Sequence, residues 1–235
     1  MSSTELYYLK RKSRLLREFD FTTRSAWAVL DRYFPGEDIP SLVAETRREF
    51  ANLIPQLPYL GGKQLFTRFI VNTAMLLAVY RVARLRGRTV EQIGELSYEI
   101  GQALIQSMPA FLLRLFTPMN FSQSYLKRLH RASLESHKRI YPEGYVFDFV
   151  PGDGKTFDYG VDYLECASCK FLAKQGAAEL APYICPADIL YSEALNWGLV
   201  RTQTLAEGAD RCDFRFKKGG ITRVNVPPAL QTVIW

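Results

Sequence analysis

The sequence predicts an α+β fold, in which a helical amino-terminal half is followed by a small antiparallel sheet with two helices. From residue 4 to about residue 137, apolar residues recur at spacings of three and four, the period of an amphipathic helix. After residue 140 the period changes to two over several short segments, which is typical of strands. We therefore expect a helical region at 1–140 and an α+β region at 141–235, packed together as one unit.

Start and stop signals divide the amino-terminal half into six predicted helical segments. One carries LYYLKRKSRLLREF, another has Pro40 in its first turn, and a third opens with a capping pattern at Thr89 and Gln92. The longest apolar run, FIVNTAMLLAVYRVA, is interrupted by Asn72 and Arg81. A membrane span needs roughly 18 uninterrupted apolar residues, so we expect a buried helix here and no membrane association.

Four strand-like and two helix-like segments follow. YVFDFV and FDYGVDYLEC alternate around the turn signal PGDGKT and predict an antiparallel hairpin. CKFLAKQGAAEL and PADILYSEALNW return to helical spacing, and LVRTQTLAEG with RCDFRFKK predicts a second hairpin around EGAD. In its last strand Cys212, Phe214 and Phe216 share one face, because successive side chains of a strand alternate. We expect this face, with its thiol, to be buried.

Composition and charge narrow the class of protein. The chain has 235 residues, of which 48% are apolar, enough for a substantial core, and it opens without a secretory-type leader. We therefore expect a cytoplasmic protein with reduced thiols. A net charge of +6 would suit an anionic partner. The basic residues are spread along several amphipathic segments without a nucleic-acid-binding motif, however, so we predict solvated helix faces and no nucleic-acid partner. The densest basic group consists of Lys127, Arg128, Arg131, Lys138 and Arg139.

The four cysteines raise the question of a metal site. Cys166 and Cys169 form a C-x-x-C motif, and Cys185 and Cys212 would complete a four-thiolate zinc site. A structural zinc site normally takes its second pair from another close C-x-x-C, whereas these two cysteines lie far apart in the sequence. The motif also lacks the strand-helix-strand unit of a thioredoxin-like redox site. We therefore predict no bound metal and no cofactor.

Cys185 has a distinctive local setting. It precedes a proline in the first turn of a predicted helix, and Asp188 lies one turn further on. The positive end of the helix dipole would favour the nucleophilic thiolate. The alternative is a buried cysteine beside a capping aspartate. The two histidines, His130 and His137, stand among basic residues and are expected on the surface.

The segment from ECASCKFLAKQG to RCDFRF resembles the signature region of the L-2-amino-thiazoline-4-carboxylic acid hydrolase family. The family pattern combines a cysteine near the end of a strand, a glycine in the next helix, a C-x-x-D segment and a closing R-T-x-T-x-x-x-G-x-x-x-C-D-F hairpin. The resemblance covers roughly the last 75 residues and leaves Cys169 outside the pattern. The matching residues are Cys166, Gly176, Cys185, Asp188, Arg201, Thr202, Thr204, Gly208, Cys212, Asp213 and Phe214.

The resemblance implies a hydrolase that opens a small cyclic amidine. Water would add at C2 of the aminothiazoline ring, and the ring sulfur would leave as the thiol of N-carbamoyl-L-cysteine. Asp188 and Asp213 would then bind the amidinium, and Arg201 the carboxylate of the substrate. Cys185 would attack C2 as a thiolate. Alternatively, a carboxylate activates water and the thiols only line the site. The expected catalytic residues are Cys185, Asp188, Cys212 and Asp213, with Cys166, Arg201 and Thr202 in substrate binding.

Two functions remain open at this point. The first is hydrolysis of a small-molecule substrate of this kind. The second is a non-catalytic relative that binds a small molecule or a metal in the same pocket and acts through a partner or a homo-oligomer surface. Pocket geometry distinguishes them. In an enzyme the thiols and acids should open onto a cavity, whereas in a structural role packing should seal them.

Overall fold

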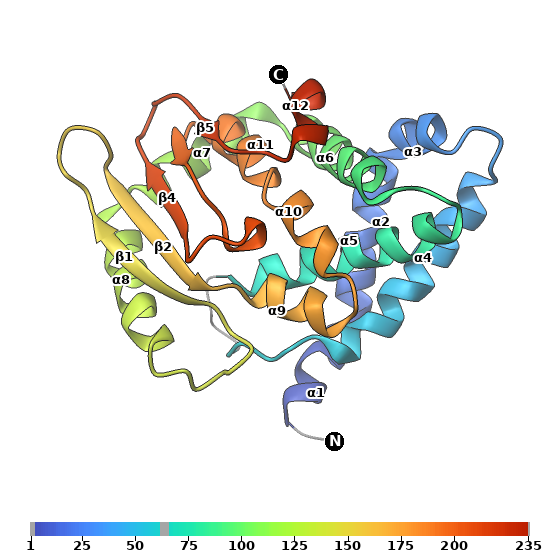
Figure 1. The fold of residues 1–235 in the computed structure, drawn as a ribbon, viewed down its shortest axis with the longest axis horizontal. Coiled ribbons are helices and arrows are strands. Elements are labelled where there is room, and N and C mark those ends of the chain that lie inside the picture. Colours follow the sequence, from blue (N-terminus) through green and yellow to red (C-terminus); the bar gives the residue numbers. More distant parts are fainter. Residues whose placement is uncertain (1–2, 62–65, 235) are drawn as a thin grey trace.

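The computed structural model of the chain describes residues 3–61 and 66–234 and confirms the predicted α+β class (Figure 1). The helices are α1 Ser3–Leu9, α2 Lys12–Ser25, α3 Trp27–Tyr33, α4 Ile39–Leu53, η1 Ile54–Gln56, α5 Thr67–Leu85, α6 Val90–Gln106, α7 Ala110–Asn120, α8 Gln123–Ser136, α9 Ala167–Lys174, η2 Ala178–Leu180, α10 Ala181–Ile184, α11 Ala187–Ala194, η3 Leu205–Glu207 and α12 Pro228–Ile234. The strands are β1 Val146–Pro151, β2 Tyr159–Glu165, β3 Leu199–Arg201, β4 Cys212–Phe216 and β5 Arg223–Val224.

The described part of the amino-terminal half contains eight α-helices, and the predicted number of six is wrong. The first predicted segment is divided into α1 and α2, because α1 packs against η1 and is held there by the Tyr8 hydroxyl, which donates to the Pro58 carbonyl at 3.2 Å. Two local predictions are confirmed. Pro40 lies in the first turn of α4, and Thr89 with Gln92 forms a capping box at the start of α6.

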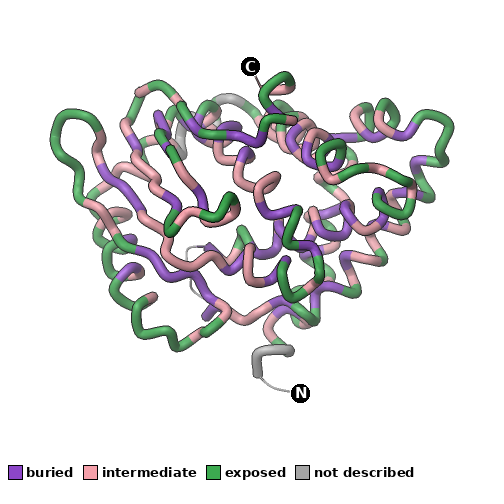
Figure 2. Tube along the Cα trace, viewed as in Figure 1, coloured by how far each residue is buried: buried purple, intermediate pink, exposed green. Residues whose placement is uncertain are grey.

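Helix α5 lies at the centre of the molecule, between the sheet and helices α2 and α4 (Figure 1). It contains the predicted buried apolar run, and it contacts α4, α6 and α9. Its buried residues lie between Ile70 and Ala83, whereas both ends of the helix are exposed (Figure 2). No helix in the described part of the chain is long and apolar enough to cross a membrane.

The sheet has the strand order β1-β2-β4-β3-β5. Both predicted hairpins are confirmed, since β1 pairs antiparallel with β2 and β3 pairs antiparallel with β4. The second hairpin is shorter than expected, because Thr204 caps the short helix η3 immediately after β3. Strand β5, parallel to β3, and the terminal helix α12 were not predicted.

The connection between β2 and β3 contains three α-helices, α9 to α11, where two were predicted. The predicted first helix ends at Lys174, because Gly176 adopts a left-handed backbone conformation, with φ of 69°, in which a helix cannot continue. The chain then re-enters helical structure through η2 and α10 before α11 begins.

The two faces of the sheet differ in chemistry. On the inner face Tyr163 lies opposite Cys212, and Val161 lies opposite Phe214. Cys212 is buried with only 7% exposure, as predicted for the face that it shares with the phenylalanines. On the outer face the Arg215 guanidinium donates to Asp162 at 2.6 Å. The inner face therefore turns its thiol and aromatic rings towards the helices.

Candidate active site

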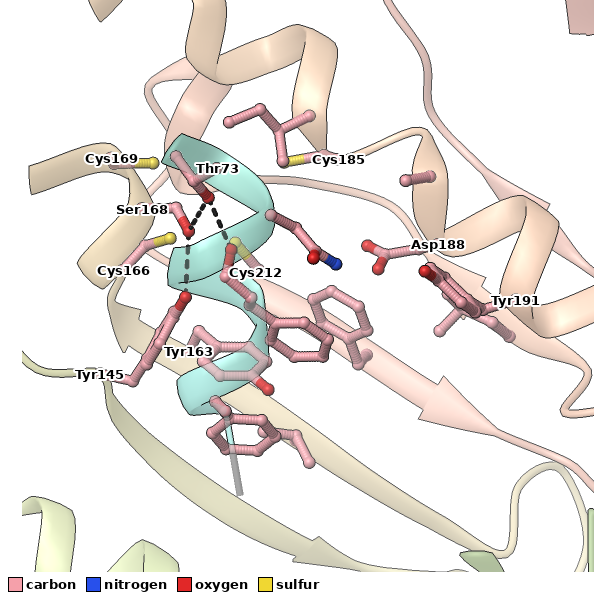
Figure 3. A pocket seen from close by; sticks show the side chains of 18 of the residues that line it. Thr73, Tyr145, Tyr163, Cys166, Ser168, Cys169, Cys185, Asp188, Tyr191 and Cys212 are labelled. Carbon is pink, nitrogen blue, oxygen red and sulfur yellow. Dashed lines mark hydrogen bonds between the residues drawn. The ribbon is translucent and has the colours of Figure 1, made fainter. Parts of the chain in front are cut away.

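A cavity of about 200 Å³ lies between the inner face of the sheet and helices α5, α9, α10 and α11 (Figure 3). Aromatic and aliphatic side chains form most of its wall, among them Tyr159, Val161, Phe214 and Phe216 from the strands. A cavity of roughly 150 Å³ accepts benzene, so this one is of a size for a ligand of about ten non-hydrogen atoms. An apolar wall with a few polar groups is typical of a small-molecule site.

All four cysteines line this cavity, and all are free thiols. Cys166 caps α9, Cys185 joins α10 to α11, and Cys212 begins β4. Cys169, which the family pattern omits, lies one turn after Cys166 on the same helix and also faces the cavity (Figure 3). The C-x-x-C spacing indicates that both thiols face the same way, because residues three apart share a helix face. Within the described residues, no group of three or more His, Cys, Asp or Glu side chains is arranged to hold a metal ion.

Cys166, Cys185 and Cys212 are held in their neutral form. Burial raises the pKa of Cys185 far above its ordinary value and raises the pKa of Cys212 to about 11. The Cys212 sulfur accepts a hydrogen bond from the Leu205 backbone N–H at 3.2 Å, which opposes the effect of burial. A hydrogen bond with Cys169, together with burial, raises the pKa of Cys166.

The local setting of Cys185 differs from the helix amino terminus that the sequence predicted. Cys185 is the C-cap of α10, and it is Pro186 that forms the N-cap of α11. The thiol donates to the Ala181 carbonyl across 3.8 Å, so it faces the carbonyl end of one helix before the next helix begins. Loss of water around the sulfur raises the pKa of Cys185 and outweighs the opposing effect of the Arg201 charge.

Asp188 brings a carboxylate to the cavity from the first turn of α11. Its Oδ2 atom accepts a hydrogen bond from Arg201 Nη1 at 2.5 Å. The Asp188 side chain is 32% exposed and lines the cavity, whereas Arg201 is only 1% exposed. Burial raises the pKa of Asp188, and the neighbouring Arg201 charge opposes this rise.

Arg201 lies behind Asp188 and does not line the cavity. Its guanidinium also donates to the carbonyls of Cys185 and Asn225, each at 3.3 Å, and it lies 5.3 Å from the centre of the Phe214 ring. These contacts connect β3, β4, α11 and the segment after β5. Arg201, the predicted substrate-binding arginine, thus holds the Asp188 carboxylate in place from a buried position outside the cavity lining.

Asp213 and Thr202, the other two predicted site residues, lie away from the cavity lining. Asp213 accepts hydrogen bonds from the Thr202 backbone N–H, the Thr202 hydroxyl and the Gln203 backbone N–H, at 2.8, 2.6 and 3.0 Å. Burial alone would raise the pKa of Asp213, but these bonds outweigh it and the pKa is lowered. The pair fixes the turn after β3. The structure therefore brings together Cys166, Cys185, Cys212 and Asp188, but not Asp213 and Thr202.

A chain of hydroxyl groups at one end of the cavity was missed by sequence reasoning (Figure 3). The Tyr145 hydroxyl lies 3.0 Å from Ser168 Oγ, which lies 2.8 Å from Thr73 Oγ1, and Thr73 reaches the Phe69 carbonyl at 2.9 Å. The Thr73 hydroxyl has one proton, which it can donate either to Ser168 Oγ or to the Phe69 carbonyl. The sequence signal of this chain of hydroxyl groups is the polar pair Asn72 and Thr73 within the otherwise apolar stretch from Phe69 to Val79.

The comparison with known families supports the resemblance seen in the sequence. Residues 69–216 match the family model described as L-2-amino-thiazoline-4-carboxylic acid hydrolase. The chain belongs to the L-2-amino-thiazoline-4-carboxylic acid hydrolase family. No curated protein and no solved structure matches the chain.

The match to the L-2-amino-thiazoline-4-carboxylic acid hydrolase family covers more of the chain than the carboxy-terminal signature segment. The match begins within α5 and ends with β4. It therefore includes Thr73, all four thiols and the Asp188–Arg201 pair. Helices α1 to α4 lie outside it, as do β5 and α12.

Proposed function

We propose that the protein is a hydrolase of a small cyclic amidine, and that Asp188 binds the amidinium and activates water. The observation that carries this proposal is a carboxylate that faces an apolar cavity and is fixed by a buried arginine. Among the described residues lining the cavity, Asp188 is the only acid, and none is lysine or arginine. A planar cation that enters this cavity thus meets a single negative charge in an apolar setting, where charge-assisted hydrogen bonds are strong.

The reaction follows from this arrangement. Arg201 binds Oδ2 of Asp188, and we assign Oδ1 to the attacking water. Asp188 takes a proton from the water as its oxygen bonds to C2 of the ring. The C2–S bond then breaks, the electron pair goes to sulfur, and the proton passes from Asp188 to the leaving thiolate. The hydroxyl group on C2 releases its proton to solvent as the carbonyl of the carbamoyl group forms. The products are a carbamoyl group and a free thiol. The raised pKa of Asp188 suits a group that first accepts and then returns a proton.

The raised pKa values of Cys185 and Cys212 favour direct attack by water over attack by a cysteine thiolate. In this proposal the thiols pack around the ring as neutral, polarisable groups. Arg201 acts through Asp188 and does not contact the carboxylate of the substrate. That carboxylate would instead meet neutral donors of the lining, such as the side-chain amide of Asn72.

The test is incubation with L-2-amino-thiazoline-4-carboxylate, following the release of free thiol with a chromogenic reagent. We expect wild-type turnover and a loss of roughly 10²- to 10⁴-fold in Asp188→Asn, the usual contribution of a general base. Asp213→Asn is the matched control, because it removes an acid from the same family motif without touching the cavity. Absence of thiol release from wild type, or equal activity in both variants, would refute the assignment.

A further inference from the structure

A second cavity lies in the helical half and adjoins the first. Its volume is about 210 Å³, and helices α2, α4, α5 and α6 form most of its wall. Among the described residues, Asn72, Ile184, Ala187 and Tyr191 line both cavities. The two spaces therefore meet along the gap between α5 and the segment from α10 to α11. Tyr191 lies three residues after Asp188, one turn along the same face of α11 (Figure 3).

The described lining of the second cavity is mostly apolar, with Asn72, Ser97 and Tyr191 among its polar side chains. Side chains such as Phe19, Val79 and Ile100 line it. Its threonine hydroxyls bond to carbonyls of their own helices, as Thr46 does to Leu42 at 2.9 Å, so they need no partner from a ligand. Arg68, the charged residue of this wall, is 58% exposed and paired with Glu18 at 2.9 Å. An apolar group is the ligand chemistry that this wall matches.

We propose that the second cavity binds an apolar extension of the substrate, whose amidine group binds Asp188. This inference rests on the proposed function and narrows its substrate class to amidines that carry an alkyl or aryl chain. The ring of an aminothiazoline fits the first cavity alone. A chain attached to it would pass Tyr191 and enter the second. The second cavity is somewhat larger than one that accepts benzene, so it suits a chain of roughly eight carbons. Each buried methylene increases affinity about fourfold, so such a chain would contribute most of the binding affinity.

The test uses binding of N-octylguanidine and N-methylguanidine, measured by calorimetry below the micelle-forming concentration. Both have the planar cationic head and no leaving sulfur, so binding is read without turnover. We expect the octyl compound to bind at least roughly 100-fold more tightly. Val79→Phe and Ile100→Phe fill the second cavity from two different helices. Each should weaken octyl binding at least tenfold and leave methyl binding unchanged.

Two controls complete the design. Val200→Phe makes the same substitution at a 38% exposed position outside both cavities and should change neither affinity. Asp188→Asn removes the charge facing the head group and should weaken both ligands. Circular dichroism establishes that each variant is folded. The inference is overturned if the octyl compound binds no better than the methyl one, if the filling variants weaken both equally, or if Asp188→Asn affects neither. Failure of wild type to release thiol from an aminothiazoline would refute only the proposed function.

Discussion

Replacement of Arg201 by alanine tests whether this arginine positions Asp188 or touches the substrate. The substitution removes a guanidinium that is 1% exposed and bonded at 2.5 Å to Asp188. Breaking a buried ion pair costs about 3–5 kcal/mol, because the remaining charge is left without a partner. Asp188 is 32% exposed towards the cavity, so we expect the lower end, about 3 kcal/mol. For a chain of this size that corresponds to a fall in melting temperature of roughly 6–12 °C.

The same variant changes the pH dependence in a defined direction. Burial raises the pKa of Asp188 and Arg201 opposes the rise, so removal of Arg201 raises this pKa further. The unpaired carboxylate destabilises the folded state at neutral pH, and this cost shrinks as the pH falls through the raised pKa, because the protonated acid carries no charge. A catalytic carboxylate also loses activity on protonation. The acid limb of kcat/KM against pH should therefore move to higher pH in Arg201→Ala.

These effects are measured by calorimetric melts and by profiles of kcat/KM against pH. The proteins compared are wild type, Arg201→Ala, Asp188→Asn and the double variant. In the double variant neither charge is left unpaired, so its loss of stability should be smaller than the sum of the two single losses by about 1–3 kcal/mol. The reasoning is refuted if Arg201→Ala leaves the acid limb in place and raises only KM for a substrate with a carboxylate. That result would mean that Arg201 contacts the substrate directly.

Two further predictions follow from the site. Cys212, with its pKa of about 11, should be alkylated by iodoacetamide at pH 7.5 roughly 30- to 300-fold more slowly than an ordinary thiol, with the rate rising as the pH approaches 11. Residue-resolved mass spectrometry measures this, and an ordinary rate at pH 7.5 would contradict the burial argument. Asp213→Ala should cost about 2 kcal/mol in a urea melt, because its bonds to Thr202 and Gln203 are lost, without moving the pH profile of kcat/KM. A shifted profile would place Asp213 in the catalytic machinery.

Much of the fold was predictable from the local periodicity of the sequence. The capping box at Thr89, the hairpin from β1 to β2 and the inward direction of Cys212 all depend on residues that are close in the sequence, so they were predictable. The outward direction of Asp213 was available from the same period of two, since adjacent residues of a strand face opposite sides of the sheet. The prediction of Asp213 as a catalytic residue was based on the family motif and did not use the alternation of side chains along the strand.

The sequence by itself determined the α+β class and the set of residues with suitable chemistry, because backbone geometry and side-chain type act over a few positions. Only the tertiary structure decided which of these residues meet. Asp188 and Arg201 form a pair because α11 packs beside β3, and Cys185 stays a neutral thiol because distant segments exclude water from it. Desolvation and ion pairing depend on the whole surrounding volume, which is assembled from segments far apart in the chain. The periodicity of one segment therefore does not reveal the ionisation of its side chains.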